Sequence, residues 1–151
     1  WCQMTEAAGY VQLLVPVLWL GMVLAISFLE APLKFGAPGV TLPIGLGIGR
    51  RVFKALNGVE IVLAVVLLVA ILIAKPSTVV WTLVLVAAAV LAIQVIFVRP
   101  PLTKRSNRVL AGETLPRSNM HYVYVAFELV KVGVLIALAL VLTSRVVEYL
   151  V

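Results

Sequence analysis

Long apolar stretches constrain the fold of this chain more than any other feature. Residues 7–29 and 76–98 each comprise 23 uncharged, mainly apolar residues. About 20 apolar residues are enough for an α-helix to cross ~30 Å of hydrocarbon at ~1.5 Å per residue. Residues 55–74 and 118–144 are also apolar, except for a few polar side chains. The sequence therefore predicts four membrane-spanning helices.

Composition supports a membrane protein of the all-α class. Of the 151 residues, 64% are hydrophobic and 12% are charged, whereas soluble domains have about 45–50% apolar residues. The first span lacks a basic start and a small-residue cleavage site, so we do not expect a cleaved signal peptide. We expect an integral membrane four-helix bundle that forms a single transmembrane domain over residues 1–151, with spans at about 8–30, 53–74, 78–98 and 121–143.

Basic residues are concentrated in the two long connections, between the first and second spans and between the third and fourth. Nine of the 12 Lys and Arg residues lie there. By the positive-inside rule, both connections face the cytoplasm and both termini lie outside it, as in a multi-pass protein of the cell (inner) membrane. The net charge of +6 then reflects contact with anionic headgroups and needs no nucleic-acid partner. The expected headgroup contacts are Lys34, Arg50, Arg51, Lys54, Arg99, Lys104 and Arg105.

The two halves of the chain have a similar layout, which is compatible with two repeated helical hairpins. The first and third spans end in Phe-x-x-x-Pro-Leu, at Phe28 and Phe97, and Thr-Leu-Pro precedes the second and fourth spans. Pro32 lacks a backbone donor and disfavours helix at Ala31, so the first span is expected to end there. The connection at 35–51 is rich in glycine, and we expect a loop or short interfacial helix whose glycines allow close packing. A phosphate-binding role is weakly supported, because no strand precedes these glycines and no P-loop lysine follows them.

Polar side chains interrupt the spans at a similar depth. A charge at the membrane centre costs about 2.5–3.5 kcal/mol on insertion scales, so such residues usually face inward, are paired and have a function. In the last span His121, Tyr124, Glu128 and Lys131 are spaced three, four and three residues apart, which places them on one helical face. The functional interpretation is a ligand-binding polar cluster that faces the cytoplasm, made of Glu30, Asn57, Glu60, Gln94, Glu128 and Lys131. The structural interpretation is that these side chains neutralise one another and join the helices, at about 0.6 kcal/mol per hydrogen bond.

Metal, haem and hydrolytic chemistry have little support in the sequence. Four-helix carboxylate metal sites use Glu-x-x-His on two helices, but Lys131 follows Glu128 at that spacing and an apolar residue follows Glu60. His121 is the only histidine, so a haem held by two histidines is excluded. No serine or cysteine nucleophile lies within helical reach of a base. We therefore expect no metal site and no catalytic residue, and the cofactor is left unassigned.

Motifs along most of the chain resemble those of small four-span membrane proteins related to transmembrane protein 205. That family typically has a phenylalanine followed by Ala-Pro-x-x-Phe after the first span and Gly-x-x-x-Phe at the entry to the second. A proline with basic residues follows its third span, and a histidine opens its fourth. The resemblance implies a four-helix bundle and no established chemistry. The matching residues here are Phe28, Ala31, Pro32, Phe35, Gly49, Phe53, Pro100, Lys104, Arg105 and His121.

A second resemblance involves the start of the second span. Lys54, Asn57 and Glu60 are similar to the Arg-Ala-x-x-Asn-x-x-Glu signature of the membrane-associated glutathione and eicosanoid enzymes. This resemblance implies four spans, a trimeric assembly and a glutathione held at the cytoplasmic side by those three residues. Here lysine replaces arginine and its interval to Asn57 is one residue short, which turns Lys54 by about 100° on a helix.

These patterns leave three classes of function open. The favoured one is a multi-pass membrane protein that binds or transports a small ligand, ion or lipid-like molecule at the polar cluster, without enzymatic activity. The first alternative is a membrane-bound glutathione-dependent enzyme that acts on a lipophilic substrate, and the second is an accessory subunit of a larger membrane complex. The expected partners are the lipid bilayer and either further copies of the chain or a larger complex.

Overall fold

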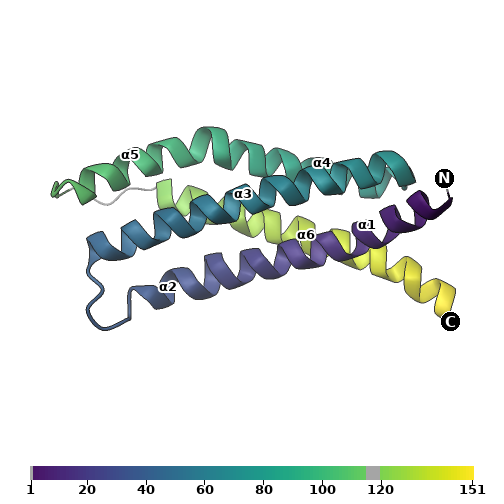
Figure 1. The fold of residues 1–151 in the computed structure, drawn as a ribbon, viewed down its shortest axis with the longest axis horizontal. Helices are drawn as coiled ribbons and strands as arrows, with labels where there is room; N and C mark the ends of the chain where they lie inside the picture. Colours follow the sequence, from purple (N-terminus) through teal and green to yellow (C-terminus); the bar gives the residue numbers. More distant parts are fainter. Residues whose placement is uncertain (1, 115–119) are drawn as a thin grey trace.

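The computed structural model describes residues 2–114 and 120–151, which form four long helical rods (Figure 1). Each rod is long and apolar enough to cross a membrane. The predicted all-α four-helix bundle is thereby confirmed, and the chain is a multi-pass membrane protein. The rods consist of α1 (Cys2–Val23), η1 (Leu24–Glu30) and α2 (Ala31–Lys34); α3 (Leu42–Ala74); α4 (Thr78–Ile93), η2 (Gln94–Val98) and α5 (Arg99–Leu110); and α6 (Met120–Leu150).

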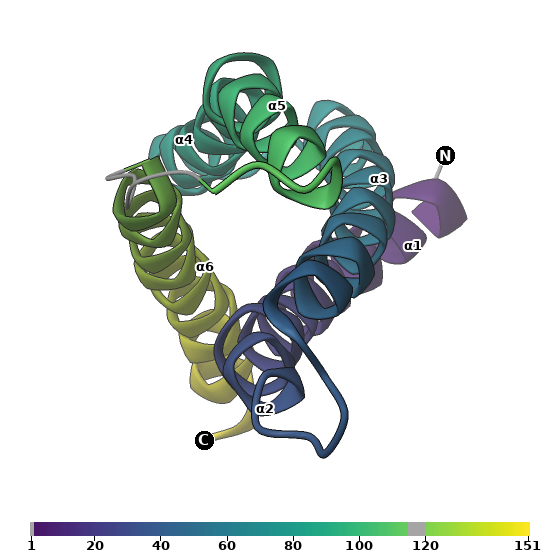
Figure 2. The same cartoon turned by 90° about the vertical axis from the view of Figure 1, so that its left-hand side faces the viewer.

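The rods stand around a common centre when the bundle is viewed end-on (Figure 2). Helix α1 packs against α3 and α6, and α4 packs against the same two helices, so α3 and α6 lie diagonally across the bundle. Helix α1 begins and α6 ends at one end, which we call the terminal end (Figure 1). The opposite end carries the 35–41 loop and α5 with most of the basic residues, and we call it the basic end.

The first rod does not end at Ala31, so this prediction from Pro32 was wrong. The rod passes through the π-helical η1, in which the Ala31 N–H donates to the carbonyl of Ile26, and continues as α2 to Lys34. Pro32 is accommodated because it lies in the first turn of α2, where a backbone N–H needs no partner within the α-helix. The third rod has the same arrangement, because the π-helical η2 is followed by α5, which has prolines in its first turn.

The glycine-rich connection is mostly helical, and α3 begins at Leu42 rather than near residue 53. The Thr41 hydroxyl caps this end by accepting from the Ile44 N–H at 3.5 Å. A side chain at Gly45 would collide with the ring of Phe35, and a Cβ at Gly49 would lie 2.6 Å from Lys34 Nζ. These glycines let the side chains of Lys34 and Phe35 approach α3 closely, and we attribute the helix there to this packing, which outweighs the low helix propensity of glycine.

The apolar core fills the half of the bundle between its centre and the terminal end. On α3 it continues from Ala64 through Leu67 to Ile71, and the other helices contribute residues at the same levels. The turn at this end has Lys75 in a left-handed conformation, with φ 48°, and Arg145 donates to the Ser77 hydroxyl at 2.6 Å. The remaining core side chains are Trp19, Val23, Val80, Val84, Ala87, Leu91, Leu135 and Leu138.

Candidate functional site

Polar side chains from three of the four rods meet at the ammonium of Lys131 near the centre of the bundle. Lys131 Nζ lies 2.7 Å from Glu60 Oε1 and 2.8 Å from Glu128 Oε1, and it donates to Gln94 Oε1 at 2.8 Å. A lysine ammonium has three N–H donors, so all of them are used. The four side chains, which we call the charged cluster, are all buried, with exposed fractions of 0–1%.

Further hydrogen bonds link the charged cluster to the first rod. The Trp19 indole N–H donates to Glu60 Oε1 at 2.9 Å, and the Ser27 hydroxyl donates to Glu128 Oε2 at 2.9 Å. Gln94 also donates to Glu128 Oε1 at 2.8 Å. Ser27 belongs to η1 and Gln94 to η2, so both π-helical segments supply a partner to the same carboxylate. Single π-helical turns inside α-helices are often found at functional sites.

The charged cluster lies inside the membrane-spanning part of the bundle. At ~1.5 Å per residue, Glu60 is about 22 Å along α3 from Lys75, and Lys131 is about 21 Å along α6 from Arg145. Both depths fall within the ~30 Å of a hydrocarbon core that starts at the terminal end. Two carboxyl groups there surround one ammonium, so one of them has no cation of its own. Buried charges need such pairing because their desolvation is costly.

Asn57 connects the charged cluster to Arg99. Its amide is assigned with the nitrogen facing Glu60 and the oxygen facing Arg99, because only this orientation satisfies both neighbours. In this orientation Asn57 donates to Glu60 Oε2 at 3.0 Å and accepts from the Arg99 guanidinium. Arg99 also donates to the backbone carbonyl of Phe53 at 3.1 Å. A polar chain thus extends from the cluster towards the basic end.

Tyr124 lies beside this chain and shares a helical face with Glu128 and Lys131, as the spacing predicted. Its ring packs edge-on against Phe53, with centroids 5.6 Å apart. Its hydroxyl is buried and has no hydrogen-bond partner among the described residues. The side chain of His121, the fourth residue of the predicted stripe, lies outside the described part of the structure.

Glu30 is the one predicted cluster residue that is not hydrogen-bonded to the others. Its Oε2 lies 3.5 Å from Lys34 Nζ and has no hydrogen bond among the described residues. The other five predicted residues, Asn57, Glu60, Gln94, Glu128 and Lys131, form one network, although their role in binding a ligand stays a prediction.

Several residues expected to contact headgroups make contacts within the protein. The side chain of Lys34 is 9% exposed, and its Nζ lies 5.5 Å from the ring centres of both Phe35 and Phe53. Arg99 turns towards Asn57, and Arg50 donates to Asn107. Arg105 is half-buried. The exposed members of the set are Arg50, Arg51, Lys54 and Lys104.

Trp19, Ser27 and Tyr124 contact or adjoin the charged cluster but were not among the predicted site residues. The sequence could have predicted a polar partner for Trp19, because a buried indole N–H in an apolar span needs an acceptor. Glu60 is that acceptor. The hydrogen bond of Ser27 to Glu128 could not be predicted in this way, because Ser27 lies in the π-helical η1, where a regular α-helical register does not apply.

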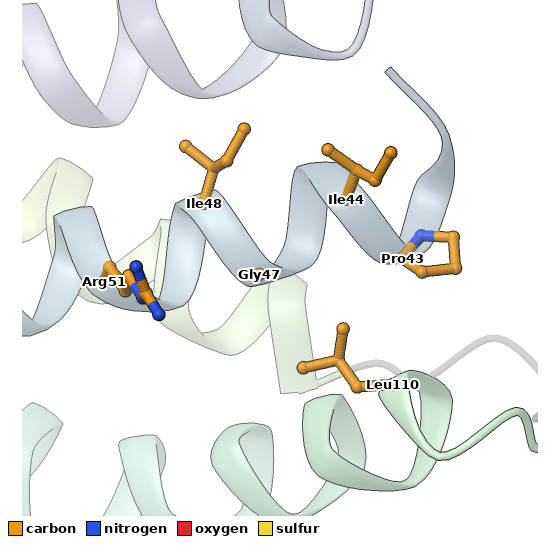
Figure 3. A pocket seen from close by; sticks show the side chains of 6 residues that line it. All are labelled: Pro43, Ile44, Gly47, Ile48, Arg51 and Leu110. Carbon is orange, nitrogen blue, oxygen red and sulfur yellow. The ribbon is translucent and has the colours of Figure 1, made fainter. Parts of the chain in front are cut away.

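Two surface hollows lie away from the charged cluster. One, of about 340 Å³, lies at the basic end, where Leu110 of α5 approaches the first turns of α3 and Arg51 stands at one side (Figure 3). The other, of about 510 Å³, lies between α1 and α6 nearer the terminal end. No residue of the cluster lines either hollow, and the cluster is closed because its four side chains are only 0–1% exposed. The first hollow is lined by Pro43, Ile44, Gly47, Ile48, Arg51 and Leu110.

The fold and this site define a multi-pass membrane bundle with a closed, charged centre. Comparison of the chain with models of known protein families, with curated proteins and with solved structures gave no match. Of the residues that carry the glutathione-enzyme resemblance, Asn57 and Glu60 are buried and Lys54 is exposed. Among the side chains that the structure describes, which exclude that of His121, no group of three His, Cys, Asp or Glu could hold a metal ion.

Proposed function

We propose that the protein is a transporter that binds a small polar solute at the charged cluster and couples its passage to proton exchange on the cluster carboxylates. The observation that carries the proposal is the buried ammonium of Lys131, held by Glu60, Glu128 and Gln94 inside the membrane. Intramembrane ionisable residues of this kind commonly mark solute paths and proton relays.

The charge balance of the cluster supports exchange over a purely structural role. One carboxylate would suffice to neutralise Lys131, yet Glu60 and Glu128 both contact it. The surplus carboxylate can be neutralised by a proton or by the positive charge of a solute, either of which competes with Lys131 for the same oxygens. Helix association alone requires no surplus charge, since hydrogen bonds between neutral groups join membrane helices at about 0.6 kcal/mol each.

The surroundings of the cluster indicate the side from which it opens. Towards the terminal end the bundle is sealed by apolar side chains such as Leu67, Leu135 and Leu138. Towards the basic end lie the polar groups of Asn57 and Arg99. We therefore infer that solute enters from the basic end, which the positive-inside rule assigns to the cytoplasm of a cell (inner) membrane protein.

The test uses purified protein in liposomes that contain a pH-sensitive dye. A panel of membrane-impermeant amino acids, dicarboxylates and quaternary amines is added outside, and the internal pH is recorded. At least one solute should change the internal pH with wild-type protein, and Glu128→Gln and Glu60→Gln should each lower that rate at least tenfold. Glu6→Gln is the matched control, because Glu6 is exposed near the start of α1.

Wild-type traces that match protein-free liposomes for every solute would contradict the proposal. So would unchanged rates in both cluster variants. Assembly separates the alternatives: copurification with a larger complex favours an accessory subunit, and a homotrimer that consumes glutathione favours an enzyme.

A further inference from the structure

We propose that Arg99, Asn57 and Tyr124 form a subsite for the carboxylate group of a small solute that enters from the basic end. The inference deepens the proposed function, because it assigns a chemical class to the solute. It is tested by binding alone, so its failure can be told apart from a failure of transport.

The hydroxyl of Tyr124 is a buried group without a partner. The residue is 8% exposed, and no hydrogen-bond partner of its Oη is present among the described residues. A buried hydroxyl normally has a partner, since an unsatisfied polar group loses its hydration without compensation. The nearest candidate partner is the Asn57 amide, but in its assigned orientation the nitrogen donates to Glu60 and the oxygen accepts from Arg99. The charged groups around the hydroxyl are Glu128, Glu60 and Arg99. A ligand oxygen on the side of Arg99 would supply the missing acceptor.

Arg99 is a cation whose contacts leave its charge unbalanced. Its acceptors among the described residues, the Phe53 carbonyl and the Asn57 amide, are both neutral, and it makes no ion pair with any of these residues. A guanidinium has five N–H donors, so several remain for a ligand. Arg99 is half-buried, so its side chain is not fully enclosed by the described residues.

All buried side-chain oxygens that lack a hydrogen bond lie on one side of the charged cluster. Within the described residues these atoms are Glu30 Oε2, Ser106 Oγ and Tyr124 Oη. Ser106 lies seven residues after Arg99, about two turns along the same face of α5 and closer to the basic end. Glu30 is four residues from the basic end of the first rod. These three oxygens, of which Glu30 Oε2 is ion-paired with Lys34, therefore lie between the charged cluster and the basic end.

A carboxylate fits these groups better than other anions. Its two oxygens match the planar fork of a guanidinium, and the Tyr124 hydroxyl can donate to one of them as a third donor. Its single negative charge balances the single charge of Arg99. An anion with two charges would be repelled by Glu60, which is linked to this subsite through Asn57.

Binding at this subsite would also change the hydrogen bonds of the charged cluster. A carboxylate that accepts from the remaining donors of Arg99 would draw the guanidinium away from the Asn57 oxygen. Asn57 would then be free to move, and its hydrogen bond to Glu60 Oε2 at 3.0 Å would be weakened. The subsite would thus couple arrival of the acid group to opening of the cluster.

The experiment measures binding of benzoate to the full chain in lipid nanodiscs by saturation-transfer NMR. Benzamide is the neutral probe of nearly the same shape, and inorganic phosphate is added as a competitor. Wild-type protein should bind benzoate saturably and at least tenfold more tightly than benzamide. Arg99→Gln should weaken benzoate binding at least tenfold and Tyr124→Phe about threefold or more, with the affinity for benzamide unchanged.

Matched controls keep the outcome decisive. Arg145→Gln removes an arginine at the terminal end, and Tyr149→Phe removes the hydroxyl of an exposed tyrosine. Tyr124→Phe deletes only a hydroxyl without a partner, so it should fold, and it remains informative if Arg99→Gln does not. The proposal is overturned if benzoate does not bind saturably, if benzamide binds equally well, if phosphate binds more tightly than benzoate, or if Tyr124→Phe binds like wild type.

Discussion

Removal of the central ammonium by Lys131→Met is expected to be the most damaging single change in the charged cluster. Methionine has a similar length, so it fills the space but leaves Glu60 and Glu128 without their common cation. Removing one partner of a buried ion pair typically costs about 3–5 kcal/mol. Glu60 keeps the Trp19 donor and Glu128 keeps the Ser27 and Gln94 donors, which places the cost near the lower limit.

Comparing the stability of Lys131→Met with that of Glu128→Gln tests the assignment of one cation between two carboxylates more directly than either variant alone. Glutamine at this position keeps an oxygen for Lys131 and removes the surplus negative charge, so its cost should be smaller, about 1–2 kcal/mol. Lys131→Met instead increases the uncompensated charge. The predicted order of stability is wild type, then Glu128→Gln, then Lys131→Met.

Reversible unfolding in mixed detergent and SDS micelles, followed by tryptophan fluorescence, measures these differences. A loss of about 3 kcal/mol changes the unfolding equilibrium constant by about two orders of magnitude. Lys54→Met is the control, because Lys54 is exposed on the same helix as Glu60 and should change stability by no more than about 0.5 kcal/mol. A Lys131→Met protein as stable as wild type, or more stable than Glu128→Gln, would refute the assignment of a buried cation between two carboxylates.

Three further changes test the packing and hydrogen bonds around the cluster. Trp19→Phe removes the indole donor to Glu60 and should cost about 1.5–3 kcal/mol in the same unfolding assay. Gln94→Leu leaves one N–H of Lys131 without an acceptor and should cost about 1–3 kcal/mol, and an unchanged midpoint would contradict the hydrogen bond. Gly45→Val should displace the Phe35 ring from α3 and lower the melting temperature, whereas Gly58→Ala, where a side chain has open space, should keep or raise it.

The overall fold could be predicted because membrane burial acts on each span separately. A helix in hydrocarbon must satisfy its own backbone, so an apolar run of sufficient length predicts a helix without knowledge of its neighbours. The inward position of Glu60, Glu128 and Lys131 could be predicted for a similar reason, because lipid is a poor environment for charge.

Local deviations from a regular helix could not be predicted from the same rules. Pro32 indicated the end of the first rod, but η1 changes the backbone so that the proline falls in a new first turn. The glycines near Gly45 indicated a connection with little helix, but α3 includes them and packs closely against the side chains of Lys34 and Phe35. In both places packing between segments outweighed the local preference of the chain.

The sequence by itself determined the number of spans, their all-α class and the depth of the polar residues, because each depends on the exchange of side chains between water and hydrocarbon. Only the tertiary structure decided the partners: that Lys131 is shared by Glu60 and Glu128, that Glu30 remains beside Lys34, and that Arg99 turns inward. The physical reason is that these distances depend on how four helices rotate against one another. Successive residues on a helix differ by about 100° in direction, so a rotation of that size moves a side chain from the centre of the bundle into lipid.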